Sequence, residues 1–129
     1  MSKYAFGKTV DLSFAQATEA VTAALAGEGF GVLTEIDVAA TLKKKLGIER
    51  APYKILGACN PQFAARALEM EPQIGALLPC NVVVRQGEDG KTIVEMMDPN
   101  AVLGLVGRPE VAPIAAEVRA RLERVLAAL

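Results

Sequence analysis

A glycine-containing turn at residues 86–90 constrains the possible folds more than any other stretch of this sequence. The segments on either side of it, 80–85 and 91–97, alternate apolar with polar residues, as strands with one buried face do. Two such segments joined by a short loop predict a β-hairpin and therefore an antiparallel sheet. If the charged side chains point to solvent, the expected core-facing residues are Cys80, Val82, Val84, Thr92, Val94 and Met96.

Three further segments, at residues 3–10, 30–36 and 53–58, are also predicted to be strands. In the last of these, Lys54 is expected to point to solvent, which turns the alternate residues inward. Glu35 is expected to point outward for the same reason. The residues then predicted to face the core are Phe30, Val32, Thr34, Ile36, Tyr53, Ile55, Gly57 and Cys59.

Apolar residues at helical spacing predict three main helices, and a shorter one at 38–46. The main helices are expected at Ser13–Leu25, Asn60–Glu71 and Pro109–Leu129. The first begins at a capping box, and the second begins with an Asn N-cap followed by proline at the first helical position. We therefore predict the α/β (α+β) class, as a two-layer sandwich of about five strands covered by three main helices. The 129 residues are expected to form a single domain, 1–129.

Composition excludes several classes of protein. A hydrophobic content of 52% argues against intrinsic disorder, and a net charge of −1 with only 14 Lys and Arg provides no basic face for nucleic acid. No apolar run approaches the roughly twenty residues that span a bilayer. The first residues also lack the continuous apolar core of a signal peptide. We expect a cytoplasmic protein with no membrane and no nucleic-acid partner.

The two cysteines lie in two short segments that each contain a proline and an asparagine, Ala58-Cys59-Asn60-Pro61 and Leu78-Pro79-Cys80-Asn81. Cys59 should sit at a strand end just before a helix N-terminus, where the helix dipole could stabilise a thiolate. The alternative is that Cys59 is a small core residue, because free cysteines are often buried. In the cytoplasm both are expected to be reduced thiols rather than a structural disulfide.

The sequence contains no recognisable catalytic constellation. It has no histidine, so Ser-His-Asp and Cys-His pairs cannot form, and its glycines match no nucleotide-binding motif. What remains is a candidate ligand site of Cys59, Asn60 and Cys80, with Met96 near it. Such a site could bind a small molecule or a soft metal such as Cu(I), with no identifiable cofactor. The alternatives are a thiol-based redox or sulfur-handling protein, and a purely structural or interaction domain.

The order of several segments resembles the domain of unknown function 302 family. The segments that carry the resemblance are Gly29-Phe30-Gly31-Val32, Ile36-Asp37, Ile55 to Pro61, and Leu78-Pro79-Cys80-Asn81. The resemblance as a whole covers nearly the whole chain. The resemblance implies a compact α/β domain of prokaryotic origin that forms a homodimer. It implies no activity and no set of catalytic residues. The high apolar fraction of so short a chain also favours a homodimer.

Overall fold

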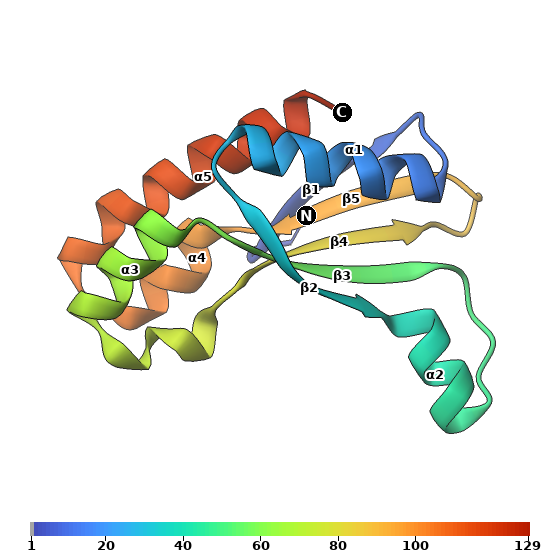
Figure 1. Cartoon of the computed structure of the whole chain (residues 1–129), viewed down its shortest axis with the longest axis horizontal. Coiled ribbons are helices and arrows are strands. Elements are labelled where there is room, and N and C mark those ends of the chain that lie inside the picture. Colours follow the sequence, from blue (N-terminus) through green and yellow to red (C-terminus); the bar gives the residue numbers. More distant parts are fainter. Residues whose placement is uncertain (1) are drawn as a thin grey trace.

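The computed structural model describes residues 2–129 and is built on a five-stranded antiparallel sheet with the strand order β1-β5-β4-β3-β2 (Figure 1). The strands are β1 (Ala5–Val10), β2 (Gly31–Asp37), β3 (Tyr53–Cys59), β4 (Cys80–Gln86) and β5 (Thr92–Met97). The predicted hairpin is confirmed, since Val84 pairs with Val94 and Val82 pairs with Met96 across β4 and β5. The five predicted strands are therefore all present, in an arrangement of the α+β class.

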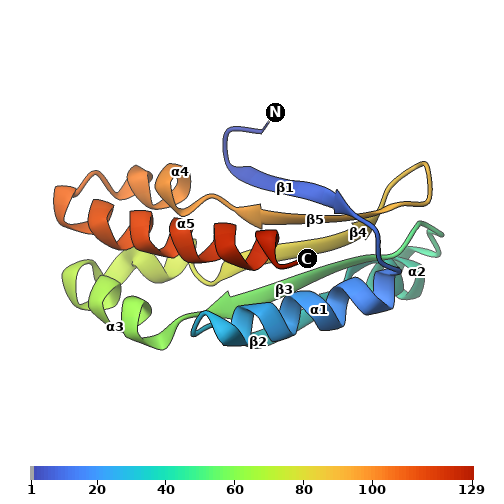
Figure 2. The same ribbon diagram turned by 90° about the horizontal axis from the view of Figure 1, so that it is seen from above.

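The three predicted main helices are present, together with shorter ones. The α-helices are α1 (Phe14–Gly27), α2 (Val38–Leu46), α3 (Pro61–Met70), α4 (Pro99–Leu103) and α5 (Ala112–Ala127). Three short 3-10 helices are η1 (Pro72–Leu77), η2 (Gly104–Val106) and η3 (Pro109–Val111). Helices α1 and α5 lie side by side on one face of the sheet, whereas α3 and α4 lie beyond the end of it (Figure 2). The prediction that all three main helices cover the sheet is therefore wrong for α3. None of these helices is both long enough and apolar enough to cross a bilayer, within residues 2–129.

The core lies between the sheet and the helix pair. The capping box at Ser13 is formed, with its hydroxyl accepting from the Gln16 backbone N–H at 3.1 Å, and it starts α1 over the sheet. Both helices bury one apolar stripe against the inward side chains of the strands. The most completely buried large side chains are Val21, Leu25, Leu56, Ile74, Val82, Val84, Val94, Met96, Val111, Ile114, Leu122 and Val125.

The predicted inward face of β3 is wrong. Ala58 pairs with Cys80 and Leu56 pairs with Val82, so the even-numbered residues of β3 face the helices. Tyr53, Ile55 and Gly57 therefore lie on the other face, and Cys59 follows them at the strand end. The prediction failed because Lys54 faces the helices but reaches past their edge, where its ammonium pairs with Glu35 at 2.6 Å and lies 5.9 Å from the ring centroid of Phe14.

The predicted core face of β2 is also wrong in its second half. A bulge between Val32 and Thr34 inserts Leu33 as an extra residue, which reverses the side-chain alternation along the strand. Val32 remains half-buried, but Thr34 and Ile36 pair with Gly57 and Ile55 and share their uncovered face. Glu35, predicted to point outward, is instead on the helix side at the sheet edge, because it pairs with Leu56.

Candidate functional site

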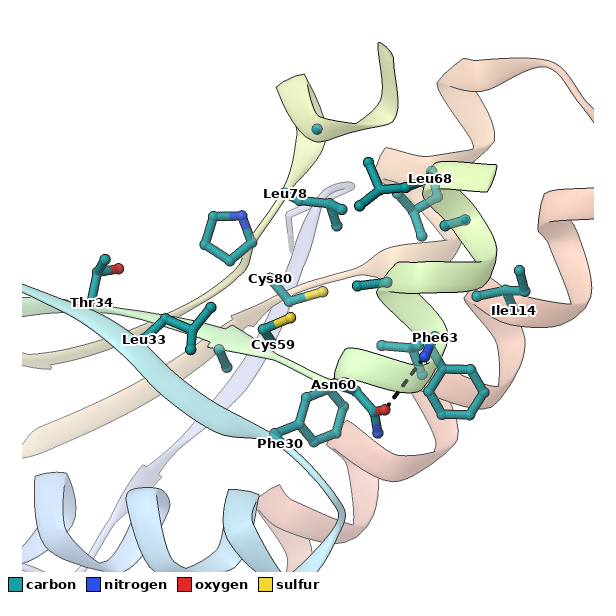
Figure 3. A pocket seen from close by; sticks show the side chains of 17 residues that line it. Phe30, Leu33, Thr34, Cys59, Asn60, Phe63, Leu68, Leu78, Cys80 and Ile114 are labelled. Atoms are coloured by element: carbon teal, nitrogen blue, oxygen red, sulfur yellow. Dashed lines mark hydrogen bonds between the residues drawn. The ribbon is translucent and has the colours of Figure 1, made fainter. Parts of the chain in front are cut away.

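A pocket of about 350 Å³ lies at the end of the sheet, where β3 runs into α3 and η1 leads into β4 (Figure 3). Helix α5 and the bulge of β2 complete its walls. Its seventeen lining residues are Phe30, Leu33, Thr34, Ala58, Cys59, Asn60, Phe63, Ala64, Ala67, Leu68, Gly75, Leu78, Pro79, Cys80, Leu103, Ile114 and Val118. Within this set only Thr34 and Asn60 carry a nitrogen or oxygen in the side chain, so the wall consists almost entirely of carbon and sulfur.

The register of two neighbouring strands brings the cysteines together. Ala58 on β3 pairs with Cys80 on β4, so Cys59 lies one residue beyond the position opposite Cys80. Both are free thiols, and Figure 3 shows their sulfur atoms side by side in the pocket. Cys59 is half-buried and Cys80 is buried. Although the face predicted for Cys59 within β3 was wrong, the strand end places its thiol beside that of Cys80.

The four residues predicted to form a site are not all in the same place. Cys59, Asn60 and Cys80 line the pocket. Met96 is not a lining residue; it is only 1% exposed and pairs with Val82 in the middle of the sheet. Among residues 2–129, no group of three or more His, Cys, Asp or Glu side chains is placed to hold a metal ion.

Burial sets the protonation of the inner thiol. The pKa of Cys80 is raised to about 11, chiefly because burial disfavours the charged thiolate and secondarily because Cys59 is close to it. Near neutral pH Cys80 is therefore a neutral thiol. A neutral thiol in an apolar wall behaves as a small hydrophobic group rather than as a nucleophile.

Asn60 holds the start of α3 against the pocket. Its side-chain oxygen accepts a hydrogen bond from the backbone N–H of Phe63 at 3.5 Å, which is the predicted N-cap, and Pro61 follows at the first helical position. Asn60 is only 7% exposed, and a Cβ atom added at Gly29 would lie 3.0 Å from its amide nitrogen. The oxygen of Asn60 is thus engaged by the helix, and this side chain positions α3.

Sequence reasoning missed most of the pocket wall. Phe30, Leu33, Leu103 and Ile114 come from segments far apart in the chain, and nothing in their local patterns links them. One signal was present within α3. Its inward face carries two alanines, Ala64 and Ala67, at positions where larger side chains would fill the space beside Cys59.

A family model described as "Domain of unknown function DUF302" matches residues 6–129. The chain belongs to the DUF302 family. A crystal structure of an uncharacterized conserved DUF302 protein from Bacillus stearothermophilus is similar to it, with 34% sequence identity, a TM-score of 0.91 and 98% of each chain covered. No curated protein matches the sequence.

The pocket of this DUF302 domain offers few side-chain groups that can take part in a reaction. Its seventeen lining residues, all within the described chain, include no Asp, Glu, Lys, Arg or Tyr. Proton transfer at the wall would have to use the two thiols, and the pKa of Cys80 is far above neutral. The arrangement is therefore suited to holding an apolar molecule by contact with carbon and sulfur.

Proposed function

We propose that this DUF302 domain is a binding protein for a small, uncharged, apolar molecule held in the pocket beside Cys59 and Cys80. The single observation that carries the proposal is the composition of the wall, in which two of seventeen lining residues have a polar nitrogen or oxygen in the side chain. The volume of about 350 Å³ falls within the range of about 300 to 1,000 Å³ that is usual for small-molecule sites.

The wall disfavours a charged ligand. An ionised group loses its hydration on entering an apolar pocket, and it needs a charged or hydrogen-bonding partner there. The side-chain oxygen of Asn60 is already engaged by Phe63, which leaves the amide nitrogen of Asn60 and the hydroxyl of Thr34 as the remaining polar side-chain groups of the wall. These few polar groups suit a ligand that has at most one neutral polar group.

Burial of the ligand supplies the binding energy. Each methylene removed from water contributes about 0.8 kcal/mol, which corresponds to about a fourfold gain in affinity. Affinity should therefore rise with the length of an alkyl ligand until the pocket is filled, and then stop rising.

The proposal is tested with the apolar dye Nile red and a pair of variants on α3. Ala64 lines the pocket and is half-buried, whereas Ala65 is exposed and does not line the pocket. We expect the wild-type protein to bind Nile red saturably with a blue-shifted emission, and Ala64→Phe to weaken binding at least about tenfold, or about 1.4 kcal/mol. Ala65→Phe is the matched control and should bind as the wild type does.

A milder variant, Ala64→Leu, keeps the test valid if the phenylalanine disturbs folding, and circular dichroism monitors the fold of each protein. Binding that is equal in the wild type and in both Ala64 variants would contradict the proposal. So would an absence of saturable binding in the wild type.

The two sulfur atoms favour a soft metal such as Cu(I) as the second candidate, because thiolates prefer such ions. The high pKa of Cys80 weighs against this candidate, and also against rapid thiol exchange, since both need the thiolate. Native mass spectrometry of the purified protein separates the two functions. A bound metal that is lost in Cys59→Ser would replace the proposal of an apolar ligand.

A further inference from the structure

The pocket has a closed end and an open end. At the closed end the lining residues are buried, and Ile114 and Val118 of α5 are only 2% and 4% exposed. At the open end the lining residues reach the surface, where Leu33 is 67% exposed and Leu68 is 42% exposed. Figure 3 shows Leu33 and Thr34 on one side of the two thiols and Ile114 on the other. The pocket therefore runs from the surface at the bulge of β2, past the thiols, to α5.

The closed end has no free partner for a polar group of a ligand. Of the lining residues, all within residues 2–129, only Asn60 is both buried and polar. Its oxygen accepts from Phe63, and its amide nitrogen lies against Gly29, where an added Cβ atom would be 3.0 Å from it. A hydroxyl group buried without a hydrogen bond loses its hydration and gains nothing in return. A polar group of the ligand is therefore expected at the open end, where water and the exposed Thr34 can bond to it.

We propose that the ligand is a single straight alkyl chain that carries one neutral polar group at its end, and that it binds tail first. This inference rests on the proposed function and specifies the class of molecule and the direction in which it lies. The terminal methyl group packs against Ile114 and Val118. The middle carbons cross the sulfur atoms of Cys59 and Cys80, and the polar group stays in water beside Leu33. Fatty alcohols and their neutral glycosides belong to this class.

The two exposed leucines at the open end fit such a ligand. Leu33 is the extra residue of the β2 bulge and Leu68 lies on α3, so two separate segments each place a large apolar side chain there. A chain that leaves the pocket past them keeps contact with carbon up to its polar end, which removes apolar surface of both protein and ligand from water. A compact ligand confined to the closed end would leave both leucines in water.

Intermolecular NOEs between 1-octanol and methyl groups of the wild-type protein test the direction of binding. We expect the terminal methyl group of bound octanol to give NOEs to Ile114 and Val118, and the methylene group next to its hydroxyl to give NOEs to Leu33. Leu46 is the control, because it is 67% exposed but lies on α2 away from the pocket, and it should give none. The reverse pattern, or equal NOEs from both ends of octanol to Ile114, would overturn the inference.

Two relatives of 1-octanol supply a second test through their affinities. 1,8-Octanediol would have to bury a hydroxyl group at the closed end, so we expect it to bind at least about tenfold more weakly than 1-octanol. Octyl glucoside has the same chain and a bulky neutral head group that cannot follow the chain into the pocket. Below its critical micelle concentration it should bind within about threefold of 1-octanol, because its head group stays in water.

The outcomes separate this inference from the proposed function. If 1-octanol binds saturably but 1,8-octanediol binds equally well, or octyl glucoside does not bind, the pocket still holds an apolar molecule and tail-first binding is wrong. If none of the three compounds binds saturably, the proposed function fails and the inference fails with it.

Discussion

Cys80 links the pocket to a measurable dependence of stability on pH. In the folded chain its pKa rises from 9.0 to about 11, first because the thiol is buried and then because Cys59 lies near it. Between these two values the unfolded chain releases a proton that the folded chain keeps. The unfolded state is therefore favoured as pH rises, and the stabilisation present below about pH 9 is lost towards about pH 11.

We expect the free energy of unfolding to fall by about 2 kcal/mol more in the wild type than in Cys80→Ala between about pH 8 and about pH 10.5. Urea unfolding at the two pH values measures this difference. Cys59→Ala is the control and should keep most of the wild-type fall, because the main cause of the raised pKa is burial of Cys80 itself. If Cys80→Ala loses as much stability as the wild type, Cys80 is not a buried thiol of raised pKa.

Single residues also show where reasoning from the sequence failed. Lys54 and Glu35 are predicted to point to solvent, but both lie on the helix side of the sheet, where their side chains form an ion pair. Long charged side chains can reach water from a face that is largely buried, so one charge does not fix the facing of a strand. The alternation of β4 and β5 was read correctly because several residues in each strand agreed.

At the scale of elements, local signals were sufficient to predict the strands and main helices. The capping box of α1, the Asn-Pro start of α3 and the hairpin between β4 and β5 each depend on neighbouring residues, and each is present. The bulge in β2 is different. Its extra residue, Leu33, is visible only in the pairing of β2 with β3, two strands that are separated in the sequence by α2.

Close packing of β2, β3 and the Leu78-Pro79 segment depends on Gly57. A Cβ atom at Gly57 would collide with the hydroxyl of Thr34 and come within 2.9 Å of Cγ of Pro79. We expect Gly57→Ala to lower the free energy of unfolding by about 1 to 3 kcal/mol, as overpacking does. Urea denaturation measures the loss.

Two companion variants make this prediction specific. Gly31→Ala is the control on β2, since no atom lies within 4 Å of its added Cβ, and it should change stability little. Thr34→Ala removes the colliding hydroxyl, so the double variant with Gly57→Ala should recover part of the loss. A Gly57→Ala protein as stable as Gly31→Ala would show that the three segments are not packed this closely.

For the whole molecule, the pocket is a product of tertiary structure. Its wall combines the end of β3 with the bulge of β2, one face of α3, the segment before β4 and the first half of α5. The sequence indicated the two cysteines and Asn60 because they lie beside prolines, where a strand ends or begins and where α3 starts. It could not indicate Leu33 or Ile114, whose place in the wall depends on how α5 and β2 meet the end of the sheet. Met96 is part of the predicted site only because its sulfur is a soft metal ligand, and not because of its position in the sheet.

The central claim is that the pocket holds a small apolar molecule, and a titration with straight-chain alcohols followed by methyl NMR tests it most directly. With 1-octanol, we predict saturable shifts of the methyl groups of Leu68, Leu78 and Ile114 at the wall, while Leu46 and Leu105, exposed elsewhere, stay unchanged. Affinity should rise about fourfold per added methylene until the pocket is full. Shifts centred on Leu46 and Leu105, or no dependence on chain length, would contradict the account.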